Sequence, residues 1–353
     1  MIVIDGSIGE GGGQILRSAI GLATALGKDI KIVNIRAKRR NPGLQHQHLT
    51  AVRAVAEISN ASIDGGYIGS KELMFRPGRI RGGVYRFDIG TAGSTTLVLQ
   101  ALLPILPFLD RESVIEIIGG TDVPWSPPID YIRYVLMPIL KMFRYRIDVE
   151  LIRRGHYPRG GGMIRVRAIP TGFIEPIDLV DRGDLELIGG RSHCVKLPSH
   201  VAERQARAAK EYLASKGLNI PIDIELEFYD PQKDPHLGPG SGIVLYAKAS
   251  RAILGGDSLG EKGKPAEVVG REAAEKLYEE IVSGAALDRH AGDMVIPIAA
   301  IAKGESRFTV STITLHMETV IEIAKILTGC EINISRYGDK SFLVRVRGIG
   351  IER

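Results

Sequence analysis

The sequence predicts an α/β protein in which a large domain of three repeated small α/β units carries a smaller α/β domain inserted before the third unit. Three observations support this prediction. A strand, a loop rich in Gly, Ser or Thr, a helix and a second strand recur three times along the chain. A segment with a different order of elements separates the second copy from the third. The 353 residues suffice for two domains of about 100–200 residues each.

Short apolar runs alternate with small-residue loops in each copy, and this alternation places the elements. The elements of the first copy are the strand Ile2–Ile4, the loop Asp5–Gly13, the helix Gln14–Leu26, the strand Ile30–Ile35 and a further helix Gln47–Ser59. Those of the second are the strand Tyr85–Ile89, the loop Gly90–Ser94, the helix Thr95–Leu106, the strand Val114–Ile118 and a further helix Ile129–Phe143. Those of the third are the strand Arg307–Val310, the loop Ser311–Thr314, the helix Leu315–Leu327 and the strands Glu331–Arg336 and Phe342–Arg347.

Residues 181–284 interrupt the repeated pattern. The elements expected there are the strand Leu185–Ile188, the helix His200–Lys216, the strands Ile222–Phe228 and Ile243–Ala249, and the helix Ala266–Val282. Because the third copy follows this segment, we expect residues 181–284 to form an inserted small α/β domain. Residues 1–180 and 285–353 then form the catalytic domain.

The composition excludes several classes of protein. Hydrophobic residues make up 44% and charged residues 25% of the chain, so wholesale disorder is excluded. Aromatic residues are only 6%, which argues against stacking platforms for nucleic-acid bases. A net charge of +5 permits an anionic partner without requiring one. Sparse cysteines, no signal-peptide pattern and no apolar run of membrane-spanning length predict a cytoplasmic protein without a membrane partner.

The glycine-rich segment Gly9–Arg17, which joins a strand to a helix, is suited to phosphate. Backbone N–H groups of glycines approach an anion closely, and a helix N-terminus adds partial positive charge. Glu10 can hold a divalent metal beside phosphates, and Arg17 can reach the same phosphates. The segment matches neither a Walker A loop nor GxGxxG, since Gln14 stands where the last glycine belongs. A turn with solvated charges is the alternative.

A second cationic segment runs from Arg36 to His48 between a strand and a helix. Four of its first five residues are cations, and the forked guanidinium of Arg suits phosphate oxygens. Gln47 and His48 open the next helix. A solvated basic turn is the alternative, and a zinc site built from His46 and His48 lacks further ligands nearby.

Three further segments have both a functional and a structural interpretation. The loop Gly90–Ser94 is suited to an anion, but ordinary turn and capping chemistry explains it as well. Pro127 and Tyr131 offer a rigid edge and a ring suited to a flat base, or they simply open a helix. In the segment Asp288–Met294, Asp293 can accept a hydrogen bond from a ribose hydroxyl, and a polar turn before a buried element is the alternative.

His316 is the candidate nucleophile. It falls in the first turn of an expected helix, where the macrodipole disfavours imidazolium and keeps the ring neutral and nucleophilic. The alternative is structural, because His316, Val320, Ile323 and Leu327 share one apolar stripe of the helix. The pattern alone favours a core or capping histidine.

Taken together, these stretches resemble the RNA 3′-terminal phosphate cyclase family over essentially the whole chain. The motifs that carry the resemblance are DGSIGEGGGQILR at Asp5–Arg17, RNPGLQHQHLTAV at Arg40–Val52, GTAGSTTLVLQ at Gly90–Gln100, PPIDYI at Pro127–Ile132, HYPRGGG at His156–Gly162 and the segment around His316. The resemblance implies three α/β units with a smaller domain inserted before the third.

The resemblance also implies roles for individual residues. His316 matches the nucleophile that accepts AMP, Arg17 and Arg39 match residues of the catalytic centre, and Glu10 matches a glutamate that contacts metal. The positions implied for the nucleotide are Gln14, Gln100, Pro127, Tyr131, His290, Ala291, Gly292, Asp293 and Met294. The positions implied for the RNA phosphate are Arg36, Arg39, Arg40, Gln47 and His48. One departure is visible, since His290 stands where bacterial relatives carry a tyrosine against the adenine.

The activity implied by the resemblance uses ATP, a divalent metal (Mg or Mn) and an RNA 3′ end that bears a terminal phosphate. The histidine takes AMP from ATP and passes it to the RNA phosphate, and the neighbouring 2′-hydroxyl then closes a 2′,3′-cyclic phosphate. The competing interpretation is a non-catalytic relative that acts in RNA processing or ribosome assembly, and the presence of His316 favours the enzyme. An enolpyruvyl-transferase-like enzyme would need a motif for an anionic sugar or shikimate, and none is seen.

Overall fold

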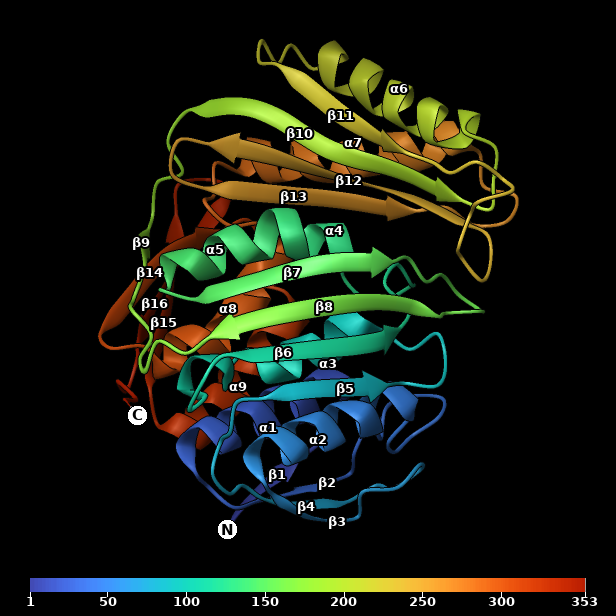
Figure 1. The fold of residues 1–353 in the computed structure, drawn as a ribbon. Coiled ribbons are helices and arrows are strands. Elements are labelled where there is room, and N and C mark those ends of the chain that lie inside the picture. Colours follow the sequence, from blue (N-terminus) through green and yellow to red (C-terminus); the bar gives the residue numbers. More distant parts are fainter. Residues whose placement is uncertain (353) are drawn as a thin grey trace.

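A computed structural model describes residues 1–352 of the chain (Figure 1). Within these residues the principal strands form four sheets of four strands each, and helices pack against them. Three of the sheets share one topology, which confirms the predicted α/β class with repeated units. The fourth sheet belongs to the segment expected as an insertion.

The first two units have the same order of elements. The elements of the first unit are β1 (Ile2–Asp5), α1 (Gly13–Leu26), β2 (Ile30–Val33), α2 (His46–Ser59), β3 (Ser62–Asp64) and β4 (Leu73–Arg76). Those of the second unit are β5 (Val84–Asp88), α3 (Thr95–Leu102), a 3₁₀ turn (Leu106–Phe108), β6 (Ser113–Gly119), α4 (Ile129–Tyr131), a π-helical stretch (Ile132–Leu136), α5 (Met137–Met142), β7 (Arg146–Arg153) and β8 (Gly162–Ile169). In each unit the first two strands are parallel, and the second strand pairs antiparallel with the fourth, which pairs antiparallel with the third.

The third unit begins ahead of the insertion, with the two-residue strand β9 (Asp178–Leu179). Its remaining elements are α8 (Arg289–Ile301), β14 (Glu305–Val310), α9 (Leu315–Thr328), β15 (Glu331–Tyr337) and β16 (Ser341–Arg347). β9 pairs parallel with β14, which pairs antiparallel with β16, as in the other units. β14 is therefore the second strand of its unit, although the sequence pattern had suggested it as the first. The helix α9 that carries His316 thus corresponds to α2.

The strand expected at Leu185–Ile188 extends to Val195. The helix Thr95–Leu106 and the turn at residues 288–294 differ from the structure for local reasons. The helix expected to reach Leu106 ends at Leu102, because Pro104 and Pro107 cannot donate the backbone hydrogen bonds of further helical turns. The polar turn considered for residues 288–294 is instead the start of α8. The side chain of Asp288 caps this helix by accepting hydrogen bonds from the backbone N–H groups of His290 and Ala291, each at 2.9 Å.

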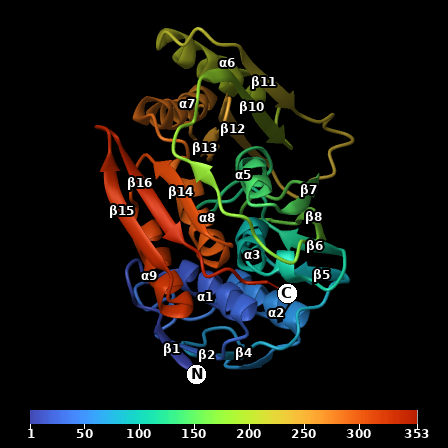
Figure 2. The ribbon, with the colours of Figure 1, turned by 90° about the vertical axis from the view of Figure 1, so that its left-hand side faces the viewer.

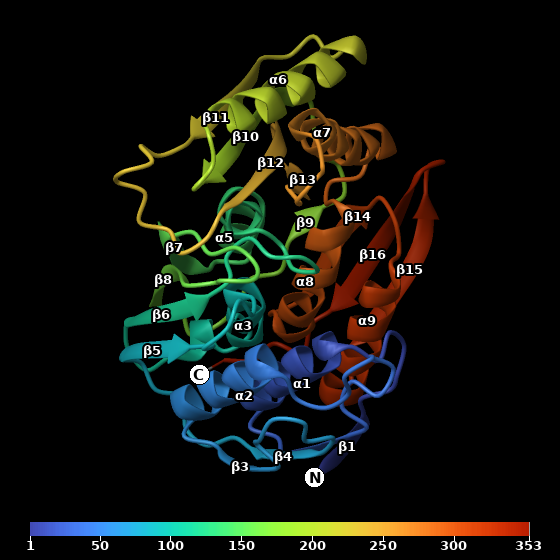
Figure 3. The ribbon, with the colours of Figure 1, turned by 90° about the vertical axis from the view of Figure 1, so that its right-hand side faces the viewer.

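The three sheets of the repeated units lie on the outside, and helices of all three units meet between them (Figures 2 and 3). Buried side chains alternate with partly exposed ones along β6, because one face of its sheet packs on the helices. One continuous apolar core joins the three units. The arrangement brings the N-terminal ends of α1 and α9 together, although they belong to different units.

Residues 185–283 contain the fourth sheet and two helices at the top of Figure 1. The elements are β10 (Leu185–Val195), α6 (His200–Ser215), β11 (Ile222–Glu227), β12 (Gly240–Ala249), β13 (Ile253–Leu259) and α7 (Ala266–Ser283). Their apolar residues form a second buried cluster, separate from the core of the three units. This separation supports the predicted division at residues 181–284, which stays a proposal.

Among the helices described, none has the length and hydropathy that crossing a membrane requires.

Candidate active site

The glycine-rich loop before α1 is held against two other parts of the chain. Gly9 and Gly11 adopt positive φ angles of 51° and 60°, a region that glycine enters without a steric penalty. The backbone N–H of Glu10 donates to Oγ1 of Thr319 at 3.2 Å, and Nζ of Lys38 donates to the carbonyl of Gly9 at 2.7 Å. Contacts from α9 and from the basic segment therefore hold the backbone of the loop at Gly9 and Glu10.

His316 lies at the start of α9 and faces this loop. Its side chain is 50% exposed, whereas Val320, Ile323 and Leu327 on the same helix are buried. Nδ1 of His316 lies 2.7 Å from Oε2 of Glu10 and also contacts Oε1 of Gln14. The imidazole is therefore outside the apolar core, and the structural interpretation of His316 as a core histidine is wrong.

The two oxygens beside Nδ1 determine which ring nitrogen of His316 carries the proton. Both are acceptors, so the neutral imidazole carries its proton on Nδ1 and its lone pair on Nε2. Burial lowers the pKa of His316, the nearby Asp293 carboxyl raises it, and the guanidinium groups of Arg17 and Arg39 lower it further. The net shift favours the neutral ring that a nucleophile requires.

The carboxylate of Glu10 also forms an ion pair with Arg39. Glu10 is only 17% exposed, so this pairing takes place in a partly desolvated site. The arrangement combines an anionic oxygen, a guanidinium and an imidazole around one helix N-terminus. Mg²⁺ in proteins is usually bound by one or two carboxylates together with phosphate oxygens, and Glu10 can supply such a carboxylate.

Asp293 on α8 is linked to the same helix end. Its Oδ1 accepts a hydrogen bond from Oγ1 of Thr314 at 2.8 Å, and Thr314 caps α9 by accepting from the backbone N–H of Met317 at 3.0 Å. Burial raises the pKa of Asp293 to about 7. Asp293 and His316 therefore flank the N-terminus of α9.

A small pocket lies next to this pair, between α1, α3 and α8. Five of its lining residues are positions that the sequence had suggested: Gln14, Arg17, Gln100, Asp293 and Met294. Apolar side chains such as Leu103 and Pro297 complete its wall. Nε2 of Gln100 lies 2.9 Å from the sulfur of Met294. Helices of three different units thus contribute to this small concave site.

Arg17 and His48 lie beneath the glycine-rich loop. A Cβ atom built on Gly13 would stand 2.3 Å from Nε2 of His48 and 2.9 Å from Nη1 of Arg17, so glycine is required there for close approach. Burial lowers the pKa of His48 to about 2, with help from Arg17 and other nearby cations, and burial lowers that of Arg17 to about 10. Nε of Arg17 is buried and lacks a hydrogen-bond partner within residues 1–352.

Comparison with known proteins adds the family. The model of the RNA 3′-terminal phosphate cyclase family matches residues 8–334. The chain belongs to this family. Three similar proteins are named RNA 3′-terminal phosphate cyclase. The one from Hyperthermus butylicus is 56% identical to this chain over 353 residues, the one from Caldivirga maquilingensis 55% over 342 residues and the one from Staphylothermus marinus 53% over 354 residues. These alignments cover 99%, 96% and 99% of this chain and 98%, 96% and 99% of the respective relatives. Relatives with this identity over the whole chain are named for the enzyme, and the protein is therefore an enzyme.

In this member of the cyclase family, some residues of the basic segment hold neighbouring loops, and others reach Glu10 or are exposed. Arg36 donates hydrogen bonds to the carbonyls of Asn41 and Gly43, the latter at 2.9 Å, and so holds its own loop. Gln47 accepts from the backbone N–H of Ser94 at 2.9 Å, which joins α2 to the loop before α3. Arg39 reaches Glu10, and Arg40 is exposed. The assignment of these residues to RNA phosphate stays a prediction.

The residues expected around the base do not all face the pocket. The ring of Tyr131 is buried at 1% exposure, and its hydroxyl donates to Oδ1 of Asp288 at 2.6 Å. It meets the exposed ring of His290 edge-on, with 6.4 Å between ring centroids. Ala291 is buried beside it. Tyr131 thus supports the start of α8 in this structure, and its contact with a nucleotide stays a prediction.

Two other predicted positions have structural contacts. The carbonyl of Pro127 accepts from Oγ1 of Thr96 at 2.8 Å. Gly292 is packed so closely that a Cβ there would lie 2.7 Å from Val310.

Sequence reasoning missed Thr314, Thr319 and Lys38 as parts of the site. Thr314 precedes an apolar helix, and this is the usual signal of an N-cap. Lys38 belongs to the recognised cluster of cations. Thr319 gives no local signal, because its contact with Glu10 depends on the packing of α9 against α1.

Proposed function

We propose that this protein is an ATP-dependent RNA 3′-terminal phosphate cyclase that works through a covalent histidyl-AMP intermediate. The observation that carries the proposal is the arrangement of His316. Its ring is half exposed beside a glycine-rich helix N-terminus, with Nδ1 facing Glu10 and Gln14 and Nε2 left for attack. The names of the relatives support the substrate class.

The chemistry explains why a nucleophile is needed. An RNA 3′-phosphate is a poor electrophile because an oxygen of the phosphate would have to leave as oxide or hydroxide. Transfer of AMP to that oxygen turns it into part of a good leaving group. The site must then stabilise several crowded phosphates, and preorganised cations and backbone N–H groups do this most effectively.

Three steps follow. The lone pair on Nε2 of His316 attacks the α-phosphorus of ATP, and the bond to the bridging oxygen breaks, so that pyrophosphate leaves with the electron pair. An oxygen of the RNA 3′-phosphate then attacks the same phosphorus, and the N–P bond breaks back to Nε2. Finally the RNA 2′-hydroxyl attacks the phosphorus of the RNA 3′-phosphate, loses its proton to solvent and displaces AMP.

The neighbouring side chains assist the first step. The His316 ring gains positive charge as the N–P bond forms, and the carboxylate of Glu10 at Nδ1 offsets it. Arg17 and Arg39 supply cations for the triphosphate, and Gln100, Asp293 and Met294 line the small pocket beside the proposed position of the nucleoside. A divalent ion held by Glu10 would neutralise phosphate charge when bound.

The RNA end would approach from the exposed side of the basic segment, where Arg40 is free to meet a phosphate. We also propose a cytoplasmic location, in keeping with two free cysteines, Cys194 and Cys330.

The test is self-labelling. The protein is incubated with α-labelled ATP and Mg²⁺ or Mn²⁺ and then separated under denaturing conditions. We expect label on the wild type that is labile to acid and stable to alkali, no label on His316→Ala, and full label on a control at the exposed His200, His200→Ala. Label that persists on His316→Ala would show that another residue is the nucleophile. A wild type that takes no label would favour the non-catalytic factor.

A further inference from the structure

A second cluster of histidines lies between the second unit and the fourth sheet. Three of the eight histidines of the chain, His156, His193 and His236, are buried at 7%, 0% and 4% exposure. His156 follows β7, His193 lies on β10, and His236 lies between β11 and β12. The pocket beside His316 is lined by other residues, so the proposed reaction gives these side chains no role.

Several nitrogens of these rings lack a hydrogen-bond partner. Across the described part of the chain, nothing pairs with Nε2 of His156, with either ring nitrogen of His193 or with Nε2 of His236. Buried polar atoms in folded proteins are nearly always paired, so these unpaired nitrogens mark a place suited to a ligand that accepts their lone pairs.

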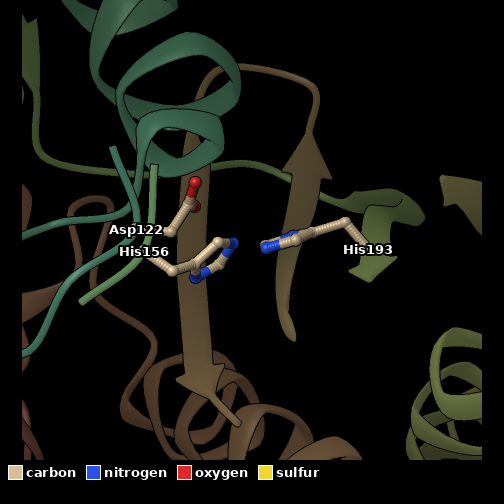
Figure 4. A group of neighbouring side chains, drawn as sticks. All are labelled: Asp122, His156 and His193. Carbon is tan, nitrogen blue, oxygen red and sulfur yellow. The ribbon is translucent and has the colours of Figure 1, made fainter. Parts of the chain in front are cut away.

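Asp122, which follows β6, completes a compact set of donors. One ligand atom from each of Asp122, His156 and His193 lies within 4.8 Å of the others. Figure 4 shows the nitrogens of His156 and His193 facing each other, with Asp122 on the side of His156. The two rings approach with 5.2 Å between their centroids.

The fourth sheet leaves room for these rings. A Cβ atom on Gly240 would lie 2.0 Å from Cγ of His156, and one on Gly242 would lie 3.0 Å from Cε1 of His193. Glycine at Gly240 is therefore needed for the imidazole of His156 to enter. This region of β12 is shaped around the histidines.

The charged groups around the cluster are paired with one another. The buried guanidinium of Arg154 pairs with Asp122 at 3.1 Å, with Asp130 at 2.5 Å and with Glu227 at 2.7 Å. Arg133 and Arg191, at the edge of the cluster, also pair with Asp130 and Glu227. Three guanidinium groups thus face three carboxylates, and the groups left without a partner are the imidazole nitrogens. The bond from Arg154 orients the Asp122 carboxylate, as an outer hydrogen bond does for a carboxylate that binds metal.

Orientation of the His156 ring also matches metal ligation. Histidines that bind metal commonly direct one ring nitrogen at a carboxylate or a backbone carbonyl and the other at the ion. The ring of His156 has a hydrogen bond with the backbone of Asp122, which leaves Nε2 for an ion. His193 has both ring nitrogens unpaired, so either of them is available.

We propose that Asp122, His156 and His193 bind one Zn²⁺ ion that links the second α/β unit to the inserted segment. Imidazole nitrogen and carboxylate oxygen are common zinc ligands, and a fourth position is left to water. Zinc bonds of about 2.0–2.2 Å need donor atoms about 3.3 Å apart, so donor atoms that lie within 4.8 Å of one another have to approach by up to about 1.5 Å on binding. The ion binds without any redox change, and its role is to hold the two parts of the molecule together.

The test uses the full chain with His316→Ala, so that the proposed catalytic imidazole cannot contribute a metal ligand. After treatment with a chelator, the protein is titrated with Zn²⁺ against a chromophoric competitor, and with Co²⁺ to follow visible ligand-field absorption. We expect one equivalent of Zn²⁺ and a cobalt spectrum. Adding His156→Gln, His193→Gln or Asp122→Asn weakens binding at least 10-fold and removes the spectrum, whereas His200→Gln changes neither.

The variants also report on stability. Zn²⁺ raises the melting temperature of the His316→Ala protein and leaves that of folded His193→Gln unchanged. His156→Gln and Asp122→Asn serve in the same way where His193→Gln does not fold. Absence of Zn²⁺ binding to the His316→Ala protein, or unchanged binding after all three substitutions, would overturn the proposal. Neither result depends on self-labelling with ATP.

Discussion

Oε2 of Glu10 lies 2.7 Å from Nδ1 of His316 and joins the glycine-rich loop of the first unit to the first turn of a helix in the third. This contact selects Nε2 as the nitrogen with the free lone pair. It also places an anion where positive charge would develop during attack on ATP. The predictions below depend on this pair and its surroundings.

Glu10→Gln is expected to slow self-labelling by about 10- to 100-fold, because an amide orients the ring less strongly and does not hold a divalent ion as a carboxylate does. Initial labelling rates with α-labelled ATP at several Mg²⁺ concentrations measure the effect. Glu318→Gln, at an exposed acidic position on α9, is the matched control and keeps the wild-type rate. Equal rates for Glu10→Gln and the wild type would refute the role of Glu10.

The pH dependence of labelling is expected to follow His316. Attack requires the neutral ring, and burial together with Arg17 and Arg39 lowers the pKa of His316 below its usual value of 6.5. The acid limb therefore has its midpoint below pH 6.5. Arg39→Gln removes one cation, which raises the pKa and moves the midpoint to higher pH, whatever its effect on the maximal rate. A midpoint that moves to lower pH would contradict this account.

Thr314→Ala removes the side-chain cap of α9 and the hydrogen bond to Asp293. Loss of such a cap lowers the free energy of unfolding by about 1 kcal/mol. Chemical denaturation measures the change. Thr314→Ser keeps the hydroxyl and restores most of the stability, and an equal loss in Thr314→Ser would show that the hydroxyl is not responsible.

Gly13→Ala is expected to abolish most of the labelling. The added Cβ would lie 2.3 Å from Nε2 of His48, so the start of α1 or the His48 ring has to move. Gly83→Ala is the matched control, because its nearest neighbour would be at 3.6 Å, an ordinary contact. Labelling rates and circular dichroism of both variants separate a local displacement from loss of the fold. Wild-type labelling by Gly13→Ala would contradict the close packing seen there.

The sequence pattern predicted the long helices of the repeated units well, because each has apolar residues at helical spacing and a clear end. Gly27 illustrates this, since it closes α1 in the left-handed conformation that favours glycine. Short strands were harder to find. β9 has only two residues, and it is defined by its pairing with β14 across the insertion rather than by its own sequence.

In the candidate site too, some features were predictable from the sequence and others were not. The glycine-rich loop, the cations and His316 were recognised because their residue types indicate phosphate chemistry and their order matches the RNA 3′-terminal phosphate cyclase family. The accessibility of His316 was not predictable, since its apolar stripe also fits a core position. Tyr131 shows the converse, because a ring that the sequence offers to a base is buried against α8.

By itself, the sequence determined the class of fold, the order of the repeated units, the family and the residue types available for chemistry. Local spacing and residue chemistry are sufficient for those conclusions. Only the tertiary structure decided which nitrogen of His316 is free, which cations meet Glu10, and that Asp122, His156 and His193 share one buried place. These properties depend on contacts between residues far apart in the chain, and such contacts form only when the units pack around a common core.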